Sequence, residues 1–261
     1  MKKTLIALTV AASAAVSGSA MAWTQGGVSG GVDIGGSLTP EAKVIPWEAQ
    51  IGKPVQDLDG QIRQGSITAD IPVNNTISIL GIRTVTNSGF TGGEGMTPQI
   101  SYGDTVDFNA SENGVAPVTL DVKSADDISK TIGTLNTSLN VVARLSRIHP
   151  DGTGAEQFNV SAHESGLVFF GGVGHYYPNI SGEAKAGEAN NLFPSVEDKF
   201  IDFGGKDVGN WRTTITSQYN YSGYYASAIK AGDSVKLTLN NPAATDEIKW
   251  TAKLPITVSY M

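Results

Sequence analysis

Apolar and polar residues alternate along several short stretches of the chain, and this alternation is typical of half-buried β-strands. The apolar positions of five such stretches are Ile45-Trp47-Ala49-Ile51, Ile67-Ala69-Ile71-Val73, Val118-Leu120-Val122, Leu139-Val141-Ala143-Leu145 and Val235-Leu237-Leu239. Glycine, proline and other turn residues separate the stretches, as they do in an antiparallel sandwich. The pattern therefore predicts an all-β fold.

The same alternation fills the last residues of the sequence, IKWTAKLPITVSYM. The apolar positions there are Trp250, Ala252, Leu254, Ile256, Val258 and Tyr260. Lysine, threonine, proline and serine occupy the positions between them. We therefore expect a long strand with one buried face and one solvent-facing face.

Another alternating stretch, WTQGGVSGGVDIGGSLTP, begins at Trp23. Its alternate positions are Val28, Gly30, Val32, Ile34, Gly36 and Leu38. Glycine at inward positions weakens a strand, so this segment is poorly suited to hold itself in a sheet. We predict an extended arm that becomes a strand only when another chain offers a groove. A disordered N-terminal tail is the alternative.

Residues 1–22 have the features of a secretory signal peptide. Lys2 and Lys3 precede an apolar stretch, and Ala20-Met21-Ala22 forms an A-x-A cleavage site. Cleavage of 22 residues from 261 would leave 239 and change the net charge from −7 to −9. The acidic charge argues against binding to nucleic acid.

The domain organisation follows from length and loop composition. The chain is much longer than an immunoglobulin-like sandwich of about 100 residues. Glycine-rich loops are concentrated between residues 90 and 210. We therefore expect one domain over residues 40–261, with an insert at roughly 90–210.

The insert is expected to contain one or two short helices. Ser195-x-x-Asp198 has the form of a helix cap, and Val196, Phe200 and Phe203 would share one face of the helix that follows. A second capping pattern, Ser124-x-x-Asp127, precedes the alternating stretch around residue 139.

The two alternating ends together resemble those of chaperone–usher pilus subunits. The fold of that family is an incomplete immunoglobulin-like sandwich completed by donor-strand exchange. A periplasmic chaperone fills the open groove first, and the N-terminal arm of the next subunit then replaces it. The resemblance implies that residues 23–39 are the donor-strand arm and that the C-terminal strand binds the chaperone. Strand addition uses backbone hydrogen bonds for affinity and alternate side chains for register.

Within that superfamily, the chain is most similar to the Fae-type fimbrial subunits of enterobacteria, which build thin adhesive fibres. The likeness is carried by VDIGGSLT at residues 32–39, ITVSY at 256–260, Trp47-Glu48, Phe169-Phe170-Gly171-Gly172 and Ala231-Gly232-Asp233. It also accounts for the absence of cysteine. The resemblance implies a major or minor structural subunit at the cell surface, with no cofactor. Its implied partners are a periplasmic chaperone, an outer-membrane usher and neighbouring subunits.

A lectin site for galactose-terminated host glycans lies in an insert of the family's major subunit, and no residue of that site matches this chain. An aromatic group could nevertheless stack on sugars: Trp211, Tyr219, Tyr221 and Tyr176. The alternative is that Tyr219 and Tyr221 are core residues of a strand. The sequence leaves binding to host glycoconjugates open.

Enzyme and metal signatures are incomplete. Residues 27–31 fit the G-x-S-x-G pattern, but no strand precedes them as a nucleophile elbow requires. His149, His163 and His175 lack metal-ligand spacing, and Asp57-x-Asp59-Gly60 is only a fragment of a calcium loop. We therefore expect no catalytic residue and no metal ligand. Two alternatives to a fimbrial subunit stay open: a secreted stand-alone carbohydrate-binding protein and an exported β-sandwich hydrolase.

Overall fold

The computed structural model describes residues 23, 25–27, 29, 31–32, 34–39, 44–176, 179 and 187–261. The predicted signal peptide and two predicted donor positions, Val28 and Gly30, lie outside the described residues. The chain divides into two units, Met1–Ala42 and Lys43–Met261. The described residues of the first unit form no helix or strand.

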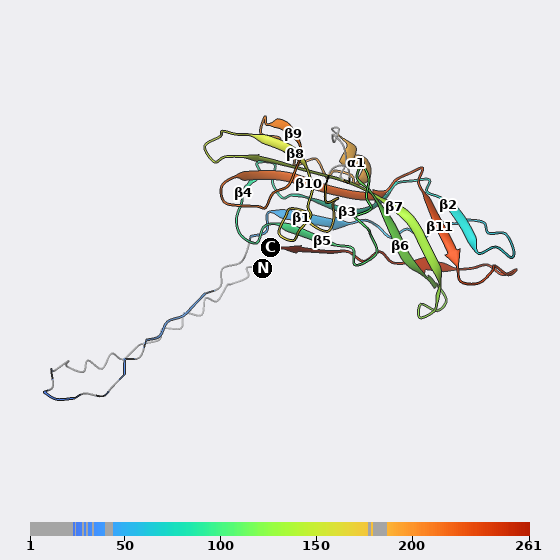
Figure 1. Ribbon diagram of the computed structural model, residues 1–261, viewed down its shortest axis with the longest axis horizontal. Coiled ribbons are helices and arrows are strands. Elements are labelled where there is room, and N and C mark those ends of the chain that lie inside the picture. Colours follow the sequence, from blue (N-terminus) through green and yellow to red (C-terminus); the bar gives the residue numbers. More distant parts are fainter. Residues whose placement is uncertain are drawn as a thin grey trace, which may run out of the picture. The chain divides into compact units, whose positions relative to one another are not determined.

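The second unit is built from β-strands, as the alternating pattern predicts (Figure 1). Its described residues form thirteen strands and one helix: β1 (Trp47–Ile51), β2 (Thr68–Pro72), β3 (Ile77–Thr84), β4 (Phe90–Thr91), β5 (Pro98–Ser101), β6 (Val115–Ser124), β7 (Thr131–Ile148), β8 (Glu156–Val160), α1 (Glu188–Leu192), β9 (Lys206–Trp211), β10 (Asn220–Ile229), β11 (Ser234–Leu239), β12 (Trp250–Ala252) and β13 (Thr257–Tyr260). All strand pairs are antiparallel except β8 with β9. The all-β fold class is confirmed.

The long strand β7 organises the larger sheet. Its first half pairs with β6 and β11, and its second half pairs with β10 and β8 (Figure 1). The path β1-β3-β10-β7-β11-β2 runs through this eleven-stranded sheet, and β12 joins it through β6. Strands β5 and β13 form a separate two-stranded sheet.

Side chains from both sheets form the main hydrophobic core. Its members include Leu80 and Ile82 of β3, Leu139 and Leu145 of β7, Tyr225 of β10 and Ile100 of β5. Neighbouring residues of a strand point to opposite faces, and a second cluster covers the other face of β7 and β10. In this cluster α1, Phe193 and Val196 pack on Val142, Tyr224 and Ala226. Strand β7 is therefore buried on both faces from Leu139 to Ser146.

Most predicted inward positions are buried. Ala69, Ile71 and Val73 are buried, as are all the alternating apolar positions predicted in β6, β7 and β11, but Ile67, the first position of the second predicted stretch, is 43% exposed. The first predicted stretch is confirmed only at Trp47, because β1 is an edge strand that pairs with β3 alone and leaves Ile51 59% exposed.

Both predicted helix positions were wrong. Ser195 has a positive φ of 66°, and residues 194–199 form turns instead of a helix. Asp127 accepts hydrogen bonds from the amide and hydroxyl of Ser129, so it closes a tight turn after β6. The helix α1 lies earlier in the chain than the first predicted helix, and the Glu197 carboxylate caps it from outside by accepting hydrogen bonds from the amides of Gly187, Ala189 and Asn190.

Candidate functional site

The prediction of one long strand over residues 250–260 was wrong, because β12 and β13 belong to different sheets and residues 253–256 between them, which include Pro255, are in neither strand. Both β12 and β13 are edge strands in the part of the chain that the structure describes. β12 pairs only with β6, and β13 pairs only with β5. Figure 1 shows the dark red β13 beside the green β5. One side of β12 and one side of β13 therefore have no strand neighbour among the described residues.

The backbone register identifies which residues face the open side. Met261 and Thr97 exchange two backbone hydrogen bonds of 3.0 and 2.9 Å, and the Ala125 amide donates to the Lys249 carbonyl at 3.0 Å. Hydrogen-bonded pairs alternate with non-hydrogen-bonded pairs in an antiparallel ladder. In β12 and β13 the backbone N–H and C=O groups of the odd-numbered residues therefore point to β6 and β5, and those of Trp250, Ala252, Val258 and Tyr260 point outward.

The side chains of the same even-numbered residues are half-buried. All six positions predicted from the sequence share this state, while each odd-numbered neighbour is exposed: Trp250, Ala252, Leu254, Ile256, Val258 and Tyr260. They pack against the main core, and burial raises the pKa of the Tyr260 hydroxyl above its ordinary value. No side chain of the six reaches full burial, so apolar surface remains exposed along this strand.

We call this combination the open edge, which comprises the outward backbone groups and the half-buried side chains of residues 250–260. No backbone hydrogen bond from its even-numbered residues is present within the described residues. An edge of this kind can accept a further strand, which would supply main-chain partners and cover the apolar side chains.

The predicted donor arm offers the complementary kind of surface. Val32, Ile34 and Leu38 are 86%, 95% and 99% exposed, and Gly36 is also exposed. Large aliphatic side chains exposed to this degree gain free energy when a partner buries them, roughly 1.5–3 kcal/mol each.

The predicted sugar-stacking residues are not brought into one cluster by ring contacts. Tyr221 is fully buried, and its hydroxyl donates to the Thr214 carbonyl at 3.3 Å, so its ring belongs to the core. Tyr219 is half-buried, with the Arg147 guanidinium 4.7 Å from its ring centroid. No ring contact between Tyr219 or Tyr221 and either of the other two residues is present within the described residues.

The rings of Trp211 and Tyr176 are each half-exposed. Trp211 ends β9, and Tyr176 stacks on the His163 imidazole with ring centroids 5.3 Å apart. These two residues are the members of the predicted group that keep accessible aromatic faces.

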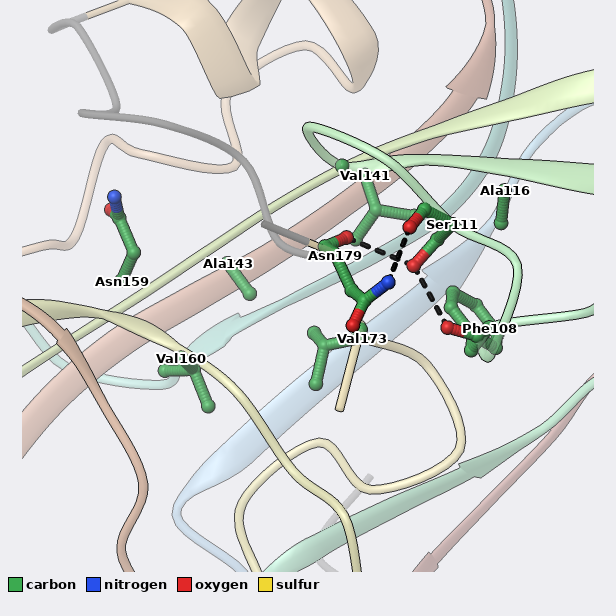
Figure 2. Close-up of a pocket in the computed structure, with 11 residues that line it drawn as sticks. Phe108, Ser111, Ala116, Val141, Ala143, Asn159, Val160, Val173 and Asn179 are labelled. Atoms are coloured by element: carbon green, nitrogen blue, oxygen red, sulfur yellow. Dashed lines mark hydrogen bonds between the residues drawn. The ribbon is translucent and has the colours of Figure 1, made fainter. Parts of the chain in front are cut away.

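The cavity in Figure 2 is too small for an organic ligand. It has a volume of about 10 Å³, which corresponds to about one water molecule. Its polar lining is internally hydrogen-bonded, because the Ser111 hydroxyl donates to Phe108 and Asn179 carbonyls, and the Asn179 side-chain amide donates to the Ser111 carbonyl. No cluster of three metal-ligating side chains occurs among the described residues. No helix of the described chain is long and apolar enough to cross a membrane.

Sequence reasoning missed the residues that link the segment around β5 to the larger sheet. Two of these residues, Trp47 and Tyr102, form hydrogen bonds to positions 49 and more than 120 residues away. Such partners follow from the folded topology and have no local sequence signal.

Comparison with known proteins identifies relatives over the whole chain. A family described as fimbrial major and minor subunits matches residues 1–261. The K88 fimbrial protein AD of Escherichia coli is 28% identical, and the F41 fimbrial protein of Escherichia coli is 29% identical. Each alignment covers 100% of this chain and 100% of the relative.

Proposed function

Because the chain belongs to the family of fimbrial major and minor subunits, we propose that it polymerises by donor-strand exchange at the open edge. The chain is a structural subunit of a surface fimbria, in keeping with its K88 and F41 relatives. In the proposed mechanism, the arm of one subunit pairs along residues 250–260 of the next. The alternate residues Val28, Gly30, Val32, Ile34, Gly36 and Leu38 then cover the apolar side chains of that strand.

The observation that carries this proposal is the coincidence of two properties on the same residues. Trp250 and Ala252 of β12 and Val258 and Tyr260 of β13 present both outward backbone groups and half-buried apolar side chains. A bound strand therefore gains hydrogen bonds and apolar burial together, and the period of two fixes its register.

A periplasmic chaperone and an outer-membrane usher are the further partners in this proposal. The open edge can pair with one strand at a time, so a chaperone strand and a neighbour's arm compete for it. The chaperone strand would protect the open edge during export. At the usher, the arm of the neighbouring subunit would then replace the chaperone strand. Free edges of this kind otherwise promote aggregation.

Glycan binding is a second candidate activity, which would contribute to attachment to host cells. The half-exposed rings of Trp211 and Tyr176 favour it, since sugar rings stack on accessible aromatic faces. The burial of Tyr221 argues for a site without that residue.

The donor role is tested by adding a charge to one face of the arm. Ile34→Asp would bury an unpaired carboxylate in the neighbouring subunit at a cost of several kcal/mol, so we expect it to prevent fibre incorporation. Ser37→Asp adds the same charge at an alternate-parity position and should leave incorporation nearly normal. Fibres purified from cells expressing each variant give the readout. Normal incorporation of Ile34→Asp would reject the donor role.

Chaperone binding to the open edge is tested by co-expressing a variant of this edge with the chaperone and measuring the complex recovered. Tyr260→Ser should reduce the amount of chaperone complex recovered, because it removes apolar burial of roughly 2 kcal/mol at the end of the strand. Ile34→Asp should leave that complex intact. If the chaperone captures the Tyr260→Ser variant in the same amount as the natural chain, chaperone recognition does not use this residue.

A further inference from the structure

The position of the open edge depends on β5. Among the described residues, strand β13 pairs with β5 alone, and these two strands are separate from the eleven-stranded sheet. On its other side, β5 exchanges backbone hydrogen bonds with a loop, through the Ile100 amide to the Phe170 carbonyl and the Phe169 amide to the Pro98 carbonyl. Any movement of β5 would therefore move the half-buried face of β13.

Side-chain hydrogen bonds tie both ends of β5 to the larger sheet. Before its start, the Trp47 indole N–H of β1 donates to the Met96 carbonyl at 2.7 Å. After its end, the Tyr102 hydroxyl lies 2.8 Å from the Tyr225 hydroxyl and 2.8 Å from the Ser227 hydroxyl, both on β10. The two links join the separate sheets across the core.

The Tyr102 link is deeply buried. Tyr102 is 1% exposed, and Tyr225 and Ser227 are fully buried. Burial raises the pKa of Tyr102 to about 12, which reflects how completely its hydroxyl is shielded from water. A hydroxyl in such a place has no water to replace a lost partner, which makes the hydrogen bonds costly to break.

We propose that Tyr102 is the positioning residue that holds β5, and through it the open edge of β13, at the distance from β10 that an incoming strand requires. The chain has no cysteine, so no disulfide can hold the two sheets together, and the hydroxyl cluster of Tyr102, Tyr225 and Ser227 takes that role. The inference rests on the proposed donor-strand exchange, and it goes further by naming what fixes the acceptor geometry.

Tyr102→Phe tests the inference because it removes one hydroxyl and keeps the ring that packs on Phe108. The protein is the full mature chain with a second copy of residues 23–38 joined after Met261 by a flexible linker. Hydrogen exchange should become roughly tenfold faster in peptides covering residues 97–101 and 257–261, which corresponds to about 1.4 kcal/mol of local opening. Peptides from β7 and β10 should change much less.

Tyr221→Phe is the matched control. It also removes the hydroxyl of a buried residue of β10, but the hydrogen bonds of Tyr221 go to residues 214 and 216 and not to a residue of β5. We expect it to leave exchange in β5 and β13 unchanged. Ser227→Ala, which spares the Tyr102–Tyr225 pair, should give an effect between those of the natural chain and Tyr102→Phe.

The outcomes separate the inference from the proposed function. If the unsubstituted extended chain is a stable monomer and Tyr102→Phe does not accelerate exchange in β5 and β13, the positioning role is rejected and donor-strand exchange stands. Equal acceleration across all strands, or the same change in Tyr221→Phe, also rejects it. If the unsubstituted extended chain fails to form a monomer, donor-strand exchange and the inference fail together.

Discussion

The Glu48 carboxylate connects the edge strand β1 to two other segments. Its Oε1 atom accepts hydrogen bonds from Lys199 Nζ at 2.7 Å and from Arg83 Nε at 2.6 Å. The hydrogen bond from Lys199, followed by that from Arg83, holds the pKa of Glu48 below its ordinary value of 4.5. The charged form of Glu48 therefore stabilises the folded state.

This coupling predicts a loss of stability in acid. A carboxylate with a lowered pKa in the folded state contributes its stabilisation above the unfolded value near 4.5, and that contribution is lost as the pH falls through the folded pKa. Glu48→Gln should lower the melting temperature at pH 7 by only about 2 °C, because Glu48 and its two cationic partners are partly exposed. The substitution should also reduce the difference in melting temperature between pH 7 and pH 3.

Thermal unfolding of the extended monomer at the two pH values gives the comparison. Glu94→Gln is the control, since Glu94 is exposed and forms no ion pair within the described residues. A Glu48→Gln variant with an unchanged pH dependence would show that Glu48 does not contribute to acid sensitivity.

Residues whose environment depends only on strand period could be predicted from the sequence. The six half-buried positions of the C-terminal strand are an example, because parity alone selects them. Tyr221 shows the limit of this approach. Its aromatic character fits both a sugar platform and a core, and only the packing of distant strands decides that it is buried.

At the scale of secondary structure, α1 and the turn after it form one cooperative unit. Glu197 accepts hydrogen bonds from the amides of Gly187, Ala189 and Asn190 at 2.8, 2.7 and 3.2 Å, and the Asn190 side chain accepts one from the Glu197 amide. A helix of five residues is too short to be stable alone, so this reciprocal capping and the contact with β10 maintain it.

Glu197→Ala should therefore release α1 from the sheet. We expect a loss of about 1–2 kcal/mol of stability and faster hydrogen exchange at residues 187–192, because three amides lose their acceptor. Asp198→Ala is the control in the same turn, since the Asp198 side chain is exposed. Protection of residues 187–192 that survives Glu197→Ala would contradict the capping role.

The same segment explains why the predicted helix was misplaced. Ser195-x-x-Asp198 has the residue types of a cap, but Ser195 takes a left-handed conformation. The acidic residue that caps the helix is Glu197, which lies between them. The actual helix precedes its cap in the sequence, an arrangement that no local capping rule anticipates. Strands were predicted better because their period extends over many residues.

At the scale of the whole molecule, the open edge leaves the fold with uncovered apolar surface. A chain of residues 39–261 without any partner should therefore aggregate or unfold readily. Adding residues 23–38 after Met261 through a flexible linker should give a monomer whose melting temperature is higher by about 10 °C or more, since several aliphatic side chains become buried.

Gel filtration gives the oligomeric state of the two proteins, and thermal unfolding gives their melting temperatures. An extension with Val32, Ile34 and Leu38 all replaced by serine provides the control for linker and length. A cooperative monomeric fold from the chain that lacks both the arm and any partner would contradict an incomplete sandwich.

In the proposed assembly, donor and acceptor lie in different segments of the chain, the arm of residues 23–39 and the edge of residues 250–260. An interface between unlike surfaces has no twofold axis, so in the proposed assembly each added subunit leaves one unused acceptor or one unused donor for the next. Such a polymer has a direction, and its two ends differ chemically. A subunit that keeps the edge but lacks a working arm can join at only one end, where it stops growth.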